Sequence, residues 1–160
     1  MINQVIENMM TENRSHFLIP GDMIASVSED NSLRHAFLVL TKVRYAKIPV
    51  LDNQDHFKGL ISLPQITDKM LGLDDITAAP LDQYCVKDVM ETGVVTIDDP
   101  YDIEEVLHAL VDSAFLPVVQ KDGTFTGIVT RREVMKGINY IGHNIDKEYT
   151  LSEKTPELKN

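Results

Sequence analysis

Four consecutive residues, Thr130 to Glu133, carry side chains that could bind an anion at the start of a helix. Thr130 and Glu133 have the Ser/Thr-x-x-Glu spacing of a capping box. Free amides at a helix N-terminus favour anions, so Arg131 and Arg132 stand where cations are unfavourable unless they serve a ligand. Guanidinium groups suit phosphate, and the arrangement indicates a phosphate site. The alternative is that Thr130 and Glu133 only cap the helix while the arginines point into solvent, and these residues taken alone favour it.

The segment around these residues predicts the elements that position them. Residues 116–119 are a short apolar run, an Asp-Gly pair signals a hairpin, and residues 125–130 are the expected return strand. Gly127 in that strand allows another backbone to approach closely. The helix that follows has apolar positions at helical spacing as far as Ile141. The predicted order is therefore strand, turn, strand and helix.

The same order occurs earlier in the chain, which indicates an internal repeat. Ile-Pro-Val at 48–50 matches Leu-Pro-Val at 116–118, and Gly-Leu-Ile-Ser at 59–62 matches Gly-Ile-Val-Thr at 127–130. In both copies the proline precedes the glycine by ten residues. Neither half is long enough to cover both faces of its own sheet, so we expect the two halves to pack together.

Other segments complete the expected elements. The sequence predicts a short helix at 1–8, an extended segment at 17–20, strands at 23–27, 45–51, 57–63 and 94–97, and helices that begin after Ser32, Ser62 and Asp102. Residues 72–80 are irregular and are interpreted as the connection between the repeats. The polar tail from His143 is expected to be frayed or dependent on a partner.

Composition and net charge exclude several classes of function. With 43% hydrophobic residues, the 160-residue chain can form a core, and it contains no apolar run of membrane-spanning length. The N-terminus lacks the pattern of a secretory signal, and the single cysteine, Cys85, fits a reduced cytoplasmic compartment. A net charge of −10 argues against binding of long nucleic acids, although a small anion could still occupy a local basic cluster.

The two copies in register resemble the cystathionine-β-synthase (CBS) domain, and together they resemble a CBS pair. The resemblance implies an α/β (α+β) fold of two β-α-β-β-α repeats, at 9–72 and 81–141, packed by pseudo-twofold symmetry and followed by a polar tail at 142–160. It also implies that adenine nucleotides bind in two clefts between the repeats. Small acidic pairs of this kind further resemble the stand-alone cyclic-di-AMP-binding CBS proteins of Gram-positive bacteria.

The resemblance also implies the residues of each cleft. Each cleft combines the Gly-x-x-Thr-x-x-acid end of one repeat with the first strand and the pre-proline segment of the other. In the family, the Thr hydroxyl and the acidic residue usually bind the ribose, main-chain atoms of the first strand contact the adenine edge, and basic side chains contact phosphate. One cleft then contains Ile24, Ala25, Tyr45, Ala46, Lys47, Thr130, Arg131, Arg132 and Glu133. Glu133 stands where the family more often has Asp, which leaves its ribose contact open.

The other cleft contains Ser62, Leu63, Pro64, Gln65, Val94, Val95, Ala114 and Phe115. It has neither an acid nor a base at the matching positions. We therefore expect it to be empty, or to bind weakly through apolar contacts.

Several of these residues have alternative roles. Six of the 15 Lys and Arg lie in segments expected at the first cleft, namely Lys42, Arg44, Lys47, Arg131, Arg132 and Lys136. Lys42, Arg44 and Lys136 can equally lie on solvated helix faces, so the ligand role is assigned to the other three. Tyr45 is either a core aromatic or a stacking platform for a base. His16 could reach the cleft, but a solvated loop histidine is the favoured interpretation.

The sequence offers no catalytic pattern. The five histidines lack metal-ligand spacing, no phosphate-binding loop or dinucleotide fingerprint occurs, and we expect no catalytic residue, metal site or cofactor. The first hypothesis is a homodimeric sensor of cyclic di-AMP, or of AMP, ADP or ATP, that alters the binding of a protein partner. The closer resemblance implies an alarmone synthetase as that partner. The second hypothesis is an interaction module whose clefts are vestigial.

Overall fold

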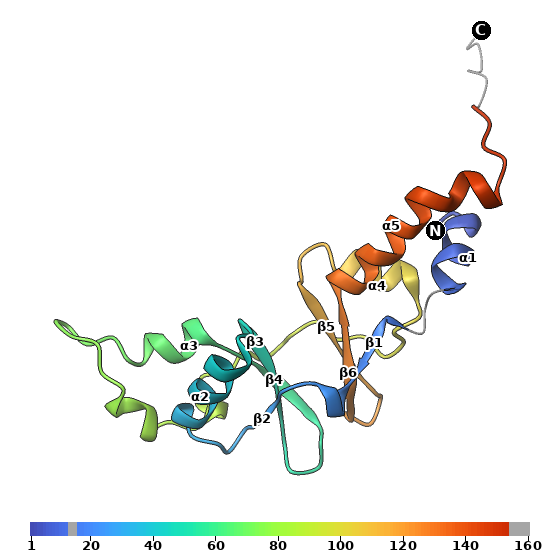
Figure 1. Cartoon of the computed structure of the whole chain (residues 1–160). Coiled ribbons are helices and arrows are strands. Elements are labelled where there is room, and N and C mark those ends of the chain that lie inside the picture. Colours follow the sequence, from blue (N-terminus) through green and yellow to red (C-terminus); the bar gives the residue numbers. More distant parts are fainter. Residues whose placement is uncertain (13–15, 154–160) are drawn as a thin grey trace, which may run out of the picture.

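The computed structural model describes residues 1–12 and 16–153 of the chain, which contain two three-stranded sheets with helices packed against them (Figure 1). The first sheet has the order β2 (Val27–Ser28), β3 (Lys47–Leu51), β4 (Phe57–Ser62), and the second has the order β1 (Leu18–Pro20), β6 (Phe125–Thr130), β5 (Phe115–Val119). The helices are α1 (Gln4–Glu12), α2 (Leu33–Val43), α3 (Leu63–Asp68), α4 (Ile103–Ala109) and α5 (Arg131–Glu148), with 3-10 turns η2 (Gly21–Met23), η3 (Ala79–Asp82) and η4 (Val86–Asp88). The predicted α/β class is confirmed.

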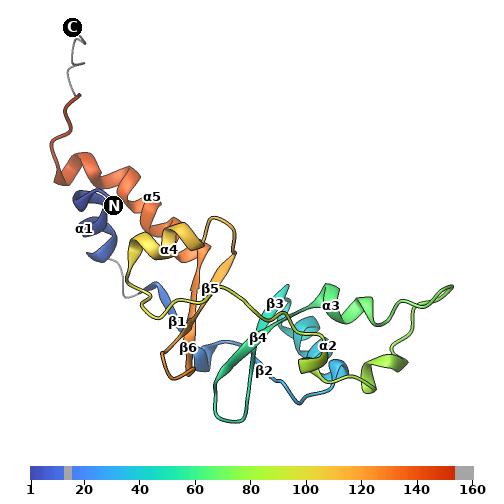
Figure 2. The ribbon, with the colours of Figure 1, turned by 180° about the vertical axis from the view of Figure 1, so that it is seen from behind.

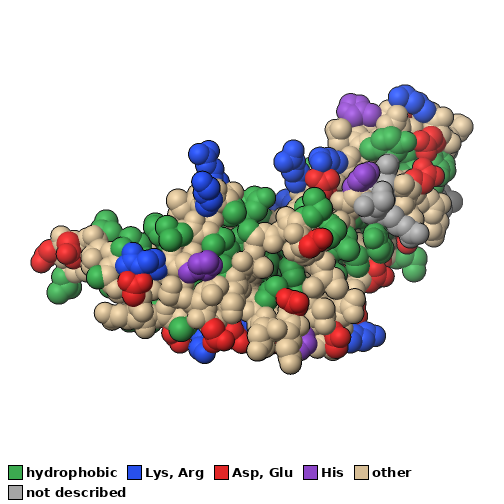
Figure 3. All heavy atoms as spheres, turned by 60° about the horizontal axis from the view of Figure 1, so that its bottom comes forward, with side chains coloured by type: hydrophobic (Ala, Val, Ile, Leu, Met, Phe, Trp, Pro, Cys, Tyr) green, Lys and Arg blue, Asp and Glu red, His purple; other side chains and the backbone are tan. Residues whose placement is uncertain are grey.

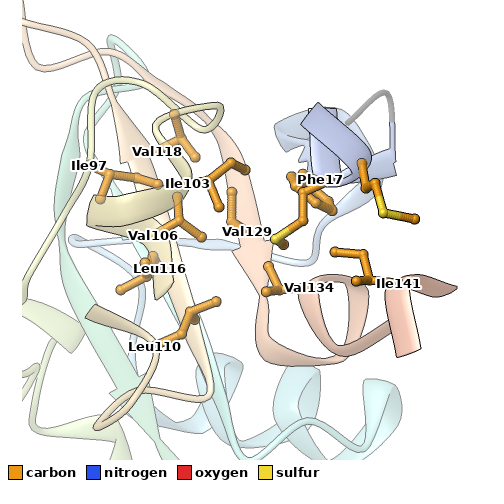
Figure 4. Close-up of a cluster of buried hydrophobic side chains, with 12 residues drawn as sticks. Phe17, Ile97, Ile103, Val106, Leu110, Leu116, Val118, Val129, Val134 and Ile141 are labelled. Carbon is orange, nitrogen blue, oxygen red and sulfur yellow. The ribbon is translucent and has the colours of Figure 1, made fainter. Parts of the chain in front are cut away.

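Each sheet has its own apolar core, and the two halves lie side by side in both ribbon views (Figures 1 and 2). In the first half, α2 packs its buried face, including Leu33 and Leu40, on strands that contribute Ile48 and Ile61. In the second half, side chains from β5, β6, α4 and α5 meet those of the N-terminal segment in one cluster (Figure 4). Capping fixes where α2 begins, because Ser32 Oγ accepts a hydrogen bond from the His35 amide, as predicted.

The two halves exchange edge segments. Strand β1 lies near the start of the first repeat but pairs antiparallel with β6 of the second, while Glu91, near the start of the second repeat, bridges Leu60 of the first. Two glycines permit this close approach. A side chain at Gly127 would collide with the Ile19 carbonyl, and one at Gly59 would collide with the Glu91 carbonyl. The predicted close approach at Gly127 is therefore confirmed.

The tips of the two hairpins also bond reciprocally. The Phe57 amide donates to the Gly123 carbonyl at 3.0 Å, and the Phe125 amide donates to the Asp55 carbonyl at 2.9 Å. The rings of Phe57 and Phe125 stack with centroids 6.1 Å apart. This reciprocity is the pseudo-twofold relation that the resemblance implied.

Two predicted strands are largely absent from the described residues. Where a strand was expected at 23–27, Gly21 to Met23 form a 3-10 turn closed by the Ile24 amide, and only Val27 and Ser28 join a sheet. Where a strand was expected at 94–97, only Ile97 pairs, exchanging hydrogen bonds with the carbonyl of Pro117 and the amide of Val119. At 94–97, therefore, a single residue pairs with β5, and no continuous ladder of hydrogen bonds forms.

Helix α5 is longer than predicted and continues through residues 142–148, which the sequence had assigned to the polar tail. Ile145 and Tyr149 pack against the second core next to α1, so this packing, rather than local sequence, sustains the helix. Helix α1 lies at Gln4–Glu12 instead of 1–8, and residues 154–160 of the tail lie outside the described residues. No helix among the described residues has the length and apolar character needed to cross a membrane.

Candidate functional site

Strand β6 passes directly into helix α5 at Thr130, so the strand and the helix fix this residue between them. Thr130 Oγ accepts a hydrogen bond from the Glu133 amide at 3.3 Å, which is the predicted cap. The Glu133 carboxylate instead accepts from Lys136 Nζ at 2.6 Å, and it is only 18% exposed. The described residues therefore show one half of the predicted capping box, and the acid is held by a cation.

Arg131 is engaged within the fold. Its guanidinium donates to the carbonyls of Leu110 at 3.0 Å, Val111 at 3.1 Å and Ser113 at 2.9 Å. These acceptors follow the C-terminal end of α4, where free carbonyls carry partial negative charge. Arg131 thus anchors α4 to the start of α5, a role the sequence did not predict because backbone carbonyls have no side-chain signature.

Arg132 lies beside it, exposed, with no hydrogen bond or ion pair to any residue in 1–12 or 16–153. On the face drawn in Figure 3, Lys and Arg side chains project in groups along one edge, although the chain is acidic overall. A free guanidinium at a helix start can bind phosphate without first breaking an internal bond. The two arginines therefore have different capacities for ligand binding.

The strand register fixes the in-sheet neighbours of each pre-proline segment. Lys47 lies opposite Ser62, and the Leu63 amide donates to the Ala46 carbonyl at 3.3 Å. In the second half, Phe115 lies opposite Thr130 in the same way. In an antiparallel hairpin the start of one strand lies beside the end of the next, so each pre-proline segment adjoins the helix start of its own repeat. Tyr45, Ala46 and Lys47 accordingly accompany Ser62, and Ala114 and Phe115 accompany Thr130.

The Ser62 end is also different from the prediction in charge. Lys47 supplies a base that was expected to be missing there, and its Nζ lies 2.6 Å from Glu91 Oε2, so an acid neutralises it. Tyr45 is 56% exposed, which excludes the alternative of a core aromatic.

The polar groups at the start of α3 bond to one another. Gln65 Oε1 accepts from the Ser62 amide at 2.8 Å and from Ser62 Oγ at 2.9 Å. Gln65 Nε2 donates to the Val89 carbonyl at 3.1 Å, and Ser62 is only 8% exposed. A ligand at this end would have to replace these bonds.

Ile24 and Ala25 lie where the chain crosses from the second sheet to the first. They follow η2, whose Gly21 lies against the Phe125 ring and the Thr126 carbonyl of β6. Both residues are half-buried, and Ala25 also packs against the first core. This segment can therefore face both halves, as expected of a wall between them.

A pocket of about 320 Å³ adjoins the start of α5. It is lined by His16, Phe17, Glu133, Lys136, Gly137 and Tyr140. The favoured interpretation of His16 as a solvated loop residue is incomplete, because the side chain is exposed yet shares the pocket with Glu133. Gly137 and Tyr140 carry no motif that marks them for a site, although their spacing from Glu133 places them on one helix face.

The chain matches known proteins over most of its length. A family model described as "CBS domain" matches residues 19–72 and 86–140. The Bacillus subtilis (strain 168) protein named "Cyclic di-AMP receptor B" is 36% identical over 141 residues, which cover 87% of this chain and 95% of that protein.

Solved structures match as well. The crystal structure of Listeria monocytogenes CbpB in complex with c-di-AMP has a TM-score of 0.75 and 44% identity, and the match covers 82% of this chain and 98% of that one. The crystal structure of CbpB from Streptococcus agalactiae has a TM-score of 0.83 and 26% identity, with 96% of each chain covered. The similarity thus extends over both repeats and their packing.

Proposed function

The chain belongs to the CBS domain family, and on this basis we propose that it is a regulatory receptor for an adenine nucleotide, with cyclic di-AMP as its ligand. One observation carries the choice of ligand: the 44% identical Listeria monocytogenes protein, nearly all of which this chain covers, is described in complex with c-di-AMP. The chain then acts by binding rather than by catalysis.

The proposed nucleotide site is at the start of α5. Arg132 is available for a phosphate, and the Thr130 hydroxyl lies in the first turn, where helix amides favour the same anion. Glu133 can accept from a ribose hydroxyl in place of Lys136, and the main chain of Ile24 and Ala25 can meet the adenine edge. In this proposal Arg131 is a positioning residue, because it already holds α4.

We propose that the other cleft, with Tyr45, Ala46 and Lys47 at its edge, stays empty or binds weakly. Gln65 satisfies the polar groups of the buried Ser62, and breaking those hydrogen bonds costs free energy that a ligand must recover, while the partly exposed Lys47 is paired with Glu91. The internal bonding of this second cleft is also the observation that favours the alternative function, an interaction module with vestigial clefts.

Regulation requires that the ligand bind two arrangements of the protein with different affinity. We propose a cytoplasmic homodimer whose surface for a protein partner changes with occupancy, and an alarmone synthetase is the partner to test first. No part of this proposal requires a metal or another cofactor.

Thermal melting of the purified protein with cyclic di-AMP, AMP, ADP, ATP and S-adenosylmethionine at equal concentrations tests the proposal. A ligand at 100 times its dissociation constant adds about 2.7 kcal/mol to stability, which raises Tm by roughly 5–10 °C for a chain of this size. We expect this shift with cyclic di-AMP, and we expect Arg132→Ala to abolish it without lowering the Tm of the free protein.

Lys121→Ala is the matched control, because it removes an exposed cation at the other end of the β5–β6 hairpin. It should retain the full shift. A shift with AMP or ATP alone would make the protein an energy sensor instead, and no shift with any nucleotide would favour vestigial clefts.

A further inference from the structure

Residues 70–77, which follow α3, form a hairpin that we call the arm. The Thr77 amide donates to the Met70 carbonyl at 2.9 Å, and the Gly72 amide donates to the Asp75 carbonyl at 2.8 Å. A Cβ at position 72 would collide with Asp75 Oδ1, so glycine permits this tight turn. The arm projects from the end of the first half in both ribbon views (Figures 1 and 2). The connection that was expected to be irregular therefore contains a hydrogen-bonded hairpin.

The two ends of the arm are fixed to the first half. Met70 and Ala78, where the arm begins and just after it ends, pack against the first core. Arg34 of α2 donates to the Ala78 carbonyl at 3.1 Å and binds the two carboxylate oxygens of Asp82 at 2.7 Å each. A bidentate pair of this kind has a defined geometry. Because its attachment is fixed, the arm has less freedom to lose on binding than a flexible loop would have.

The arm exposes large apolar side chains. Leu71 is 62% exposed, Ile76 is 73% exposed, and Leu73 in the turn is fully exposed. Leu71 and Ile76 pair across the hairpin, so their side chains lie on the same face. A single exposed apolar residue needs no explanation, but three together on a projecting hairpin form the kind of surface that marks a site of contact.

The charges of the arm indicate which surface it fits. Asp74 and Asp75 lie in its turn, and residues 70–77 contain no lysine or arginine. Two carboxylates beside exposed apolar side chains complement an apolar groove with lysine or arginine at its rim. The same carboxylates are repelled by an anionic lipid surface. A protein surface is therefore a better match for the arm than a membrane.

A second copy of this chain is a poor match. One pocket on the described residues is lined by Asp102, Glu104 and Glu105, which would repel the arm, and in another Lys136 is already paired with Glu133 at 2.6 Å. The eight residues 70–77 are also few compared with the roughly 20–30 residues on each side of a stable interface. On its own, the arm therefore suits a reversible contact with another protein.

We propose that the arm is a docking element for a different protein: Leu73 enters an apolar groove of that partner with Leu71 and Ile76 against its walls, and Asp74 and Asp75 pair with basic side chains at its rim. The arm belongs to the first half, whereas the proposed nucleotide site lies at the start of α5 in the second half. The inference therefore goes beyond the proposed function and does not depend on which nucleotide binds.

Site-specific photo-crosslinking tests this proposal in the cells that produce the protein. The full chain carries benzoylphenylalanine at position 73, and the matched control carries it at position 54, where Gln54 is an exposed turn residue of the same half. We expect position 73, and not position 54, to crosslink to a protein other than this chain, which mass spectrometry then identifies.

The captured protein is purified, and its affinity for the full chain and for variants is measured by isothermal titration calorimetry. Leu73→Asp should weaken binding by about 10-fold or more, because it places a charge in the apolar groove. Asp74→Lys should weaken binding strongly at low salt and less at high salt. Gln54→Asp adds a charge elsewhere and should leave the affinity unchanged. All three side chains are exposed, so each variant should keep its Tm within about 2 °C of the unaltered protein.

Four outcomes would overturn the proposal. They are the absence of a crosslinked protein at position 73, a crosslink only to lipid or to a second copy of this chain, equal crosslinking from position 54, and unchanged affinity of the captured protein for Leu73→Asp. The proposed function is judged separately. If no nucleotide raises the Tm of the unaltered protein, the proposed function fails, and the crosslinking and affinity results still decide the role of the arm.

Discussion

The helix starts of the two repeats differ in almost everything except their position in the fold. At Ser62 the polar groups bond to Gln65, the adjacent base is paired with Glu91, and the helix lasts six residues. At Thr130 one arginine is exposed and unpaired within the described residues, and the helix lasts 18 residues. Both follow the same proline and glycine spacing. The fold therefore provides two equivalent positions, and a few side chains decide which of them can bind a ligand.

The exchanged edge segments increase this difference. The segment that borders Ser62 brings Glu91, which neutralises Lys47 at 2.6 Å. The segment that borders Thr130 is β1, whose preceding residues His16 and Phe17 line a pocket. Each helix start thus receives one neighbouring segment from the other half of the sequence, so a substitution in one half can alter the site of the other.

The largest effect on the free protein should come from Arg131→Ala. Loss of the bonds to three carbonyls at the end of α4 should lower the free energy of unfolding by about 1–2 kcal/mol. Urea unfolding measures this change, and Arg132→Ala is the matched control, expected to lie within about 0.5 kcal/mol of the unaltered protein. Equal stabilities of the two variants would show that the two arginines do not differ in their structural role.

A smaller effect is expected at the other helix start. Gln65→Ala removes the acceptor of Ser62 and the donor to Val89, and it should destabilise the protein by about 1 kcal/mol without altering the Tm shift caused by cyclic di-AMP. Thermal melting with and without the nucleotide measures both quantities. Gln54→Ala, at an exposed turn, is the control. A changed ligand shift in Gln65→Ala would show that the Ser62 cleft takes part in binding.

The smallest expected effect concerns the two hairpin turns and the dependence of Tm on pH. The hydrogen bond from the His56 amide is the main cause that holds the pKa of Asp52 below its usual range, and hydrogen bonds from Thr124 do the same for the pKa of Asp122. A carboxyl whose pKa is lower in the folded state stabilises the protein fully above the unfolded pKa of about 3.9, and this contribution is lost as pH falls through the folded pKa. Asp52→Asn and Asp122→Asn should each flatten the fall in Tm below about pH 4.

Of the two, Asp52→Asn should flatten it more, because Asp52 accepts from Gln54 and His56 amides and from the His56 ring, whereas the bonds of Asp122 come from Thr124. Melting curves between pH 3 and pH 7 provide the comparison. If Tm falls equally at low pH in both variants and in the unaltered protein, the predicted role of the two carboxyl groups is wrong.

Local patterns predicted the elements well wherever a residue acts on its immediate neighbours. The caps at Ser32, Thr130 and Asp102, the two hairpins, and the close approach at Gly127 all follow from spacing within a few residues. The Pro-x₉-Gly spacing also revealed the repeat, because the same spacing occurs in both copies of one supersecondary unit.

The site was harder to predict, because its composition depends on which strand ends lie together. The antiparallel pairing that places Lys47 beside Ser62, for example, follows from the register of the hairpin and not from the pre-proline motif. The role of Arg131 rests on backbone acceptors some 20 residues away, and the pocket at Glu133 needs Phe17 from more than 100 residues earlier. Contacts of that separation leave no local pattern in one sequence.

The exchange of edge segments has a consequence for how the protein is made. Residues 18–20 leave the ribosome early, but their pairing partners in β6, at 127–129, are synthesised more than 100 residues later. Until then β1 has no strand to pair with, and the first sheet likewise waits for Glu91. We therefore expect the nascent first repeat to remain incomplete until residues 127–129 have been synthesised, so that the two repeats are completed as one unit.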